Sequence, residues 1–211
     1  MLVQNDFNCI GIVAKHCNLD KLCIAENQAE EFDVSQLYCN NWLDILDIWN
    51  EIIDYRTDLA ICEAEAPPCI DPPIEPEDYA LKVTLIEGGL YTNCADKTAK
   101  QQGVKRVLVY YSYARYKILS GDNDTASGTV SKTNEFSIPK TQKEIEQIAD
   151  QYRNMGLISF ENTIKFLCAN KTVFTWFTNG CEYKCDCDCD NDCGGTKARR
   201  YGLRSTNISK S

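Results

Sequence analysis

The 211-residue sequence contains a single histidine, His16, and two methionines. Because histidine is a common metal ligand and the commonest general base, its scarcity argues against a metal-dependent or histidine-dependent enzyme. His16 stands beside Cys17, but adjacent side chains rarely converge on one reacting atom, so the pair does not predict a thiol nucleophile with its base. Glycine-rich phosphate loops and serine nucleophile elbows are also missing. We therefore expect a protein that is not an enzyme.

Long apolar runs are missing as well. A membrane helix needs about 20 consecutive apolar residues, and the uncharged stretch 107–113 is far shorter. The first residues lack the basic region followed by an apolar region that marks a secretory signal. We expect no membrane contact, and a protein that is made and assembled in a cytoplasm.

Basic residues are scarce in the first third of the chain. Residues 1–80 carry a net charge of −14, residues 81–180 carry +4, and residues 181–211 carry +1. A protein that wraps nucleic acid does not normally begin with such an acidic segment, because phosphate binding relies on lysine and arginine. An acidic segment beside a basic one suits head-to-tail contact between copies, or docking on a basic partner.

Proline is rare outside one short segment. Five of the six prolines lie between residues 67 and 76, where fixed φ angles and missing amide donors exclude a helix. This semi-rigid strap, residues 66–78, separates an acidic helical segment (1–65) from a helical core (79–180). A Cys/Asp-rich and basic tail follows at 181–211.

The apolar spacing predicts a long helix over residues 35–64, preceded by a shorter one over 19–30. Acidic residues occupy the other side of the long helix. Its apolar residues recur at spacings of three and four: Trp42, Ile45, Leu46, Trp49, Ile52, Ile53 and Leu59.

The core segment is expected to be mainly helical. Residues 79–86 fit either a strand or a short helix, and Gly88 and Gly89 end the element. A second long helix is predicted over 96–119. Its aromatic residues lie on several sides, as in a helix that is buried or faces neighbouring chains. We take the following residues of the two long helices as candidates for contact with another subunit or a partner protein: Trp42, Trp49, Tyr110, Tyr113, Arg115 and Tyr116.

The end of the core segment carries clearer boundary signals. Residues 120–139 read as a loop with a short hairpin. Thr141 followed by Glu144 is a capping box that opens a helix through Arg153. Gly156 separates it from a last helix over 159–168, and residues 172–178 read as a terminal strand.

Thirteen cysteines are many for a chain of this size. The upstream ones are interpreted as buried thiols that act as small hydrophobic residues: Cys9, Cys17, Cys23, Cys39, Cys62, Cys69, Cys94 and Cys168. Five more alternate with aspartates in the tail: Cys181, Cys185, Cys187, Cys189 and Cys193.

Three interpretations of these tail cysteines stay open. They are a plainly structural or solvated tail, a zinc site, and late disulfides within or between chains. Paired Cys-x-x-Cys knuckles are absent, so zinc on these cysteines is an open but not a favoured interpretation, and we expect no cofactor. The alternating aspartates resemble a calcium loop, but Asn191 and Lys197 stand where an EF-hand requires glycine and glutamate.

A small basic segment with an aromatic residue follows, and it suits docking on an acidic protein surface or contact with DNA phosphates. A solvated C-terminus is the simpler interpretation. The contact candidates in this segment are Arg199, Arg200 and Tyr201.

Several sequence runs together resemble one protein family over residues 35–175. The runs are Leu-Tyr-Cys-Asn-Asn-Trp-Leu-Asp-Ile-Leu-Asp-Ile-Trp-Asn-Glu-Ile (37–52), Leu-Ile-Glu-Gly-Gly-Leu-Tyr-Thr-Asn-Cys (85–94), 104–116, 128–137 and Gln-Tyr-Arg-Asn-Met (151–155). This pattern resembles the head–tail connector, or ring, proteins of crAss-like bacteriophages that infect gut bacteria. The tail from residue 181 lies outside the resemblance.

The resemblance implies a mainly helical connector-type bundle and a structural role in the virion. Copies would form a ring of twelve beneath the portal protein, contact adjacent tail or ring proteins, and continue the DNA channel without sequence-specific binding. The charge distribution fits, because a ring needs two unlike faces on each copy. Two alternatives stay open: another ring or tail-hub component of the virion, and a thiol- or zinc-binding regulatory protein built on the tail.

Overall fold

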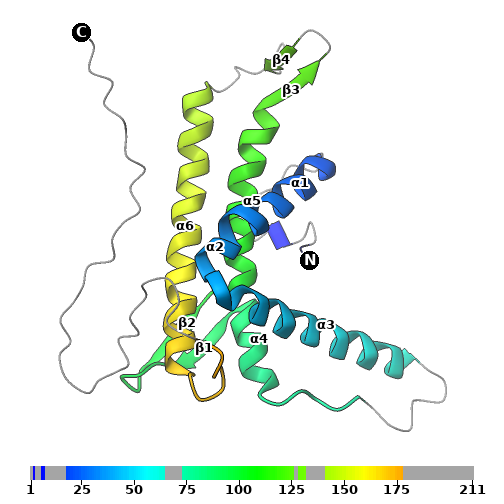
Figure 1. Ribbon diagram of the computed structural model, residues 1–211, viewed down its shortest axis with the longest axis vertical. Coiled ribbons are helices and arrows are strands. Elements are labelled where there is room, and N and C mark those ends of the chain that lie inside the picture. The colour runs from blue at the N-terminus through cyan, green and yellow to red at the C-terminus, as the bar shows by residue number, and fades with distance from the viewer. Residues whose placement is uncertain are drawn as a thin grey trace.

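Two long antiparallel helices, α5 (Val104–Gly121) and α6 (Gln142–Ala169), form the body of the protein (Figure 1). The computed structural model describes residues 2, 6–7, 18–64, 73–125, 128–131 and 141–177. Most of these residues are helical, which confirms the predicted mainly α fold class. The parts of the chain outside the described residues include residues 66–72 of the strap, residues 132–140 of the loop, and residues 178–211, which contain the whole tail.

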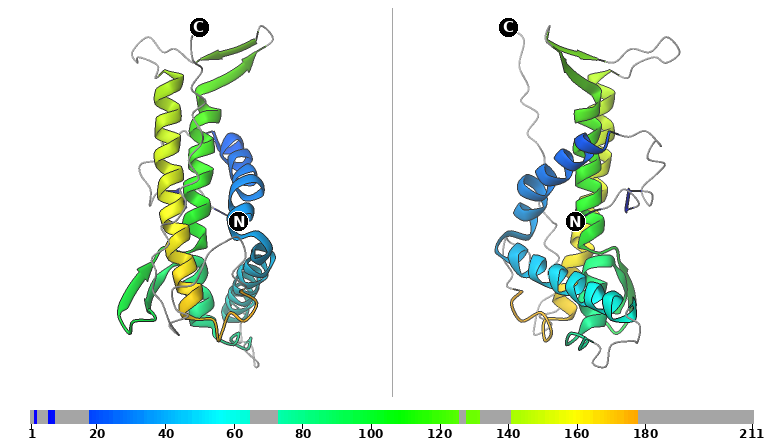
Figure 2. Two further views of the ribbon diagram at one scale, coloured as in Figure 1. Left: turned by 60° about the vertical axis from the view of Figure 1, so that its left-hand side comes forward. Right: turned by 90° about the vertical axis from the view of Figure 1, so that its right-hand side faces the viewer.

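The N-terminal helices cross the body and then turn sideways at its lower end (Figures 1 and 2). Helix α1 (Leu19–Ala29) continues through the π-helical segment η2 (Glu30–Val34) into α2 (Ser35–Tyr38). A 3-10 turn, η3 (Cys39–Asn41), then leads to α3 (Trp42–Ala64). The predicted long helix is therefore present but broken at Cys39, whose φ of 51° is incompatible with a continuing helix.

The region after the strap differs from the sequence prediction. Helix α4 (Tyr79–Glu87) settles the ambiguity over residues 79–86, and it ends at Gly88, whose φ is 89°. The predicted helix over 96–119 is wrong in its first turns, because β1 (Gly89–Thr92) pairs antiparallel with β2 (Thr98–Gln101).

The turn of this first hairpin explains the error. The Asn93 side chain accepts hydrogen bonds from the amides of Ala95 and Lys97, both at 3.0 Å, and Asp96 has a φ of 54°. An asparagine side chain that closes a turn competes directly with helix formation. Helix α5 therefore begins only at Val104, after Gly103 with its φ of 83°.

A second hairpin extends beyond the other end of α5. Strands β3 (Asp122–Thr125) and β4 (Gly128–Ser131) pair antiparallel, with Asp122 opposite Ser131. This confirms the short hairpin predicted within residues 120–139.

Helix α6 begins at the predicted capping box and runs without a break to Ala169. The Thr141 hydroxyl accepts a hydrogen bond from the Glu144 amide, and the Glu144 carboxylate accepts one from the Thr141 amide. The predicted boundary at Gly156 is wrong. This glycine faces Tyr111 of α5, and a Cβ at residue 156 would lie 2.7 Å from Cε2 of that ring. The missing side chain therefore serves close helix packing.

The predicted strand over 172–178 is also wrong. Residues 170–177 form consecutive turns, with the Phe177 amide donating to the Phe174 carbonyl at 3.0 Å. Both phenylalanines are buried against the core. A hydrogen bond from the amide of one residue to the carbonyl three residues earlier closes a turn, which an extended strand does not contain.

One main hydrophobic core joins α3, α4, α5 and α6 with the turns after α6, and its largest fully buried side chains include Tyr38, Phe166, Phe174 and Ile45. A smaller cluster holds α1 against α5 and consists of Phe7, Leu22, Val109 and Tyr113. Within the described residues, no helix is both long enough and apolar enough to cross a membrane.

The described cysteines correct the interpretation as buried thiols. Cys39, Cys62, Cys94 and Cys168 are disulfide-bonded in this structure, and only Cys168 among them is buried. Cys23 is a free thiol, but it is exposed on α1. Cys9, Cys17, Cys69 and the five tail cysteines lie outside the described residues.

Two buried tyrosines give the fold an expected sensitivity to alkali. Burial raises the pKa of Tyr111 to about 12, helped by the nearby Asp33 carboxylate, and burial also raises the pKa of Tyr38. An unfolded tyrosine titrates near pH 10, so the unfolded state loses these protons first as the pH rises. Stability is complete below about pH 10 and should fall above it by about 1.4 kcal/mol per pH unit for each tyrosine.

Urea unfolding between pH 8 and 11.5 measures this effect. The double variant Tyr38→Phe/Tyr111→Phe should lose stability less steeply above pH 10 than the wild-type protein. Equal slopes for the two proteins would contradict the assignment.

Candidate interaction surface

Helix α3 projects sideways from the lower end of the body, and two ion pairs attach it to α4 (Figure 1). Lys82 of α4 contacts Glu51 at 2.8 Å, and Arg56 of α3 contacts Glu87 at 2.5 Å. The Arg56 guanidinium holds the pKa of the Glu87 carboxyl below its usual value and also donates to the Tyr79 hydroxyl at 2.9 Å. One side of α3 is therefore held by α4, and the side away from it remains exposed.

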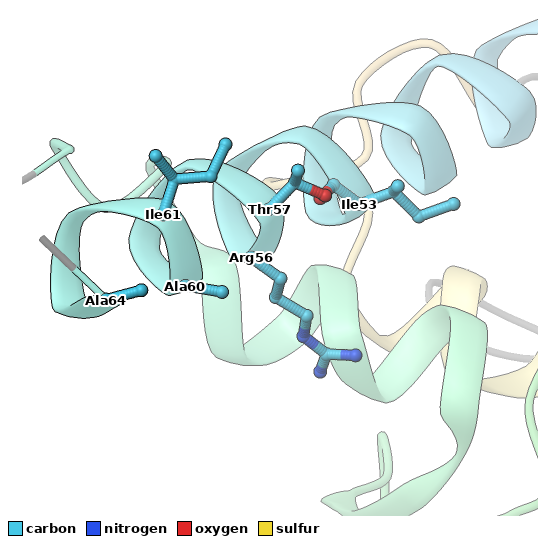
Figure 3. Close-up of a pocket in the computed structure, with 6 residues that line it drawn as sticks. All are labelled: Ile53, Arg56, Thr57, Ala60, Ile61 and Ala64. Atoms are coloured by element: carbon cyan, nitrogen blue, oxygen red, sulfur yellow. The ribbon is translucent and has the colours of Figure 1, made fainter.

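The exposed side carries a stripe of apolar, small and polar residues, which we call the α3 seam. Its members alternate spacings of three and four, the pattern of a helix that packs along another surface: Leu43, Leu46, Asn50, Ile53, Thr57, Ala60 and Ala64. Leu46 is half-buried against the core, and the other members are exposed. Leu43 is 70% exposed and Ile53 is 43% exposed, and Ile61 beside them is 56% exposed. Figure 3 shows the shallow groove over the second half of the seam, with Arg56 turned toward α4.

An acidic flank runs beside the seam. Asp47, Asp54 and Asp58 are all exposed, and they line a second shallow groove together with Pro73 and Ile74. Helix α3 as a whole carries six acidic residues and one basic residue. Its exposed side is thus both apolar and strongly negative.

The first hairpin presents a second exposed surface, on which one apolar side chain lies among threonines and two lysines. Tyr91 points inward and packs edge-on against Phe166, with ring centroids 5.2 Å apart. The alternate residues face outward and form the hairpin face: Leu90, Thr92, Thr98 and Lys100, with Lys97 exposed at the turn. Leu90 is 68% exposed and lies opposite Lys100 in the register, so an apolar and a basic side chain are neighbours on this face.

Gln101 anchors the hairpin to the body. Its buried side chain donates to the Thr84 carbonyl of α4 and accepts from the Gly103 amide at the start of α5. The Thr163 hydroxyl of α6 also contacts it, at 3.5 Å. A buried amide with partners on three helical segments fixes the orientation of the hairpin.

Helix α3 and the first hairpin lie on opposite sides of the α5–α6 pair, both near its lower end (Figures 1 and 2). The chain therefore displays an acidic and a basic exposed surface on two elements that the body separates.

Part of the charge asymmetry is compensated within the chain. Asp33 pairs with Arg115 at 2.6 Å, and Asp6 pairs with Lys105 at 2.8 Å. Both pairs join the acidic N-terminal segment to basic residues of α5. The acidic flank of α3 is not involved in these pairs.

The contact residues predicted from sequence lie elsewhere. Trp42 and Trp49 are 6% and 4% exposed and belong to the core. Tyr113 is buried in the smaller cluster, so these three side chains stabilise the fold and do not form a docking surface.

The other candidates on α5 are half-buried and also make contacts within the chain. The Tyr116 hydroxyl accepts from the Asn18 amide at 3.3 Å, and Arg106 lies over the Tyr110 ring. Arg115 pairs with Asp33 as described above. Arg199, Arg200 and Tyr201 lie outside the described residues, as do His16 and the cysteines from 181 to 193.

The α3 seam and the hairpin face were missed at the sequence level. The alternating spacing from Leu43 to Ala64 was a usable signal, but a second apolar stripe on the same helix, led by Trp42 and Ile45, hid it. The hairpin face could not be found while residues 96–101 were assigned to a helix. Across the residues that the structure describes, no group of three histidine, cysteine or carboxylate side chains could hold a metal ion.

Residues 75–187, more than half of the sequence, match a protein family described as "Family of unknown function (DUF6712)". The chain belongs to this family. The DUF6712 match contains α4, the first hairpin and the α5–α6 body, whereas α3 precedes it. No curated protein and no solved structure matches the chain.

Proposed function

We propose that this DUF6712 protein is a structural virion protein whose copies form a ring beneath the portal of a tailed bacteriophage. In this role it joins head to tail and continues the DNA channel. The observation that supports the proposal best is the pair of unlike exposed surfaces, the α3 seam and the hairpin face, on elements that lie on opposite sides of one body. The sequence resemblance to connector proteins of crAss-like phages supplies the location within the virion.

Two unlike surfaces on opposite sides suit a heterologous contact. Each copy then uses one surface toward the copy before it and the other surface toward the copy after it, and the chain of contacts closes into a ring when the rotation allows. A group of exposed apolar side chains, such as Leu43, Ile53 and Ile61 on α3, is typical of interaction sites in soluble proteins. Twelve copies would match the symmetry that the resemblance implies for the portal.

The charge of the protein suits a channel through which DNA slides. A net charge of −9 gives little tendency to hold phosphates tightly. We therefore infer that DNA passes without sequence-specific binding, and that the lasting partners are the portal protein and adjacent ring or tail proteins.

Native mass spectrometry of the full chain, alone and mixed with its portal protein, tests the proposal. We expect either a closed ring of identical copies or a monomer that assembles into a ring on the portal. A protein that stays monomeric at high concentration and ignores the portal would refute the proposed function. Electron cryomicroscopy of the portal vertex of the particle then distinguishes this ring from another ring or tail-hub component.

A further inference from the structure

We propose that the α3 seam of one copy packs on the hairpin face of the next copy, with Asp54 and Asp58 beside Lys97 and Lys100. This inference rests on the proposed function, because it names the surfaces through which the ring would close. It assigns an interface to two surfaces that the fold leaves exposed on the single chain.

The charge of α3 excludes the simplest alternative, in which two α3 helices pair with each other. The helix has one basic residue, Arg56, and Glu87 already engages it. Pairing of two such helices would place the acidic flanks of Asp47, Asp54 and Asp58 against like charges, which costs several kcal/mol at an interface. The seam therefore requires a partner that is apolar and basic.

The hairpin face meets that requirement on the same chain. Leu90 supplies an exposed apolar side chain, and Lys97 and Lys100 supply exposed positive charges within the same few residues. On α3, Ile53 and Ile61 stand next to Asp54 and Asp58 in the same way. The seam thus has several apolar side chains beside acidic ones, whereas the hairpin has one apolar side chain beside two lysines and one aspartate, Asp96, for a net charge of opposite sign.

The placement of the two surfaces favours contact between copies over contact within one. The α5–α6 body separates them in a single chain, so they cannot touch each other there (Figure 1). Their similar level along the body lets the seam of one copy meet the hairpin of a copy standing beside it. When every copy in the ring makes this contact, each α3 seam and each hairpin face is used once.

The hairpin is also held in place before any contact is made. Its inner face is fixed by Tyr91 against Phe166 and by the hydrogen bonds of Gln101. Binding to a pre-organised surface loses less conformational entropy than binding to one that has to become ordered.

Zero-length carbodiimide cross-linking of the assembled full chain tests the contact directly, because it joins carboxylates to amines that touch. An equal mixture of ¹⁴N-labelled and ¹⁵N-labelled protein separates links between copies from links within one. We expect mixed-isotope links from Asp54 or Asp58 to Lys97 or Lys100. Links from these aspartates to the basic segment 197–204 instead would assign the seam to the tail and overturn the inference.

Charge reversal gives an independent test. The variants Lys97→Glu/Lys100→Glu and Asp54→Lys/Asp58→Lys should each raise the concentration for half-assembly by at least about tenfold, because like charges then face each other. The four side chains are exposed, so folding should be unaffected, and circular dichroism checks this. The matched control for the lysine variant, Lys143→Glu/Lys165→Glu, lowers the charge by the same amount at exposed residues of α6 and should assemble like the wild-type protein.

Combining the two reversed surfaces restores opposite charges and should return assembly to within about threefold of the wild-type protein. If the wild-type protein forms a ring but the reversed variants assemble equally well, the interface is wrong and the proposed function stands. If the wild-type protein forms no ring alone or on the portal, the proposed function fails and this inference fails with it.

Discussion

Replacing Phe166 with alanine is expected to lower the free energy of unfolding by about 3–5 kcal/mol. Phe166 is completely buried in α6. Its ring packs against Tyr91 of the first hairpin at 5.2 Å and against Phe174 of the following turns at 5.7 Å. Removal of the ring loses its transfer free energy and leaves a cavity between α6, the first hairpin and the turns that follow α6.

Urea unfolding measures this loss, and hydrogen exchange locates it. The amides of β1 and β2 should exchange faster in Phe166→Ala, because Tyr91 loses its contact. Ile158→Ala in the same helix is the matched control: this side chain is 59% exposed, and its removal should change stability by less than about 0.5 kcal/mol. A similar small loss for Phe166→Ala would contradict the assigned role.

The second large effect is expected at Gly156. A leucine there should destabilise the protein by about 3 kcal/mol, because any side chain at this residue is forced into the buried ring of Tyr111. Thermal unfolding of Gly156→Leu beside Met155→Leu, at an exposed neighbour, measures the difference.

The alanine variant separates close packing from helix propensity. An alanine in place of glycine in an uncrowded helix stabilises it by about 1 kcal/mol. Gly156→Ala should lack this gain, because its Cβ would approach the Tyr111 ring to 2.7 Å. An increase in stability of the full 1 kcal/mol would show that the ring moves aside freely.

A sequence signal predicted an element boundary correctly where the residues that form the boundary interact within one helical turn. The hydroxyl of Thr141 and the carboxylate of Glu144 satisfy backbone groups within one turn, so their spacing alone located the start of α6. Glycine is a weaker signal. Gly88 ends a helix, whereas Gly156 lies in the middle of one, and only the presence of Tyr111 across the helix pair separates the two cases.

The candidate surface could not be located from the sequence, because the sequence does not show which face of α3 is covered by other elements. The spacing in residues 42–64 identifies apolar stripes on α3, but not that one stripe packs on the core while the other stays exposed. The charge pattern likewise did not show which acidic residues form ion pairs within the chain. Net charges by segment suggested unlike flanks, and the structure pairs Asp33 with Arg115 within the chain while the acidic flank of α3 remains exposed.

The break at Cys39–Asn41 makes α3 a separate helix, and a small change in its direction moves its far end by a large distance. Its 23 residues extend about 34 Å, so a change of about 10° in its direction would move Ala64 by about 6 Å. Buried residues of α3, including Trp42 and Trp49, and the ion pairs from α4 to Glu51 and Arg56 together hold this direction. In the proposed ring, the circumference would then depend on contacts inside each subunit as well as on the residues that touch between subunits.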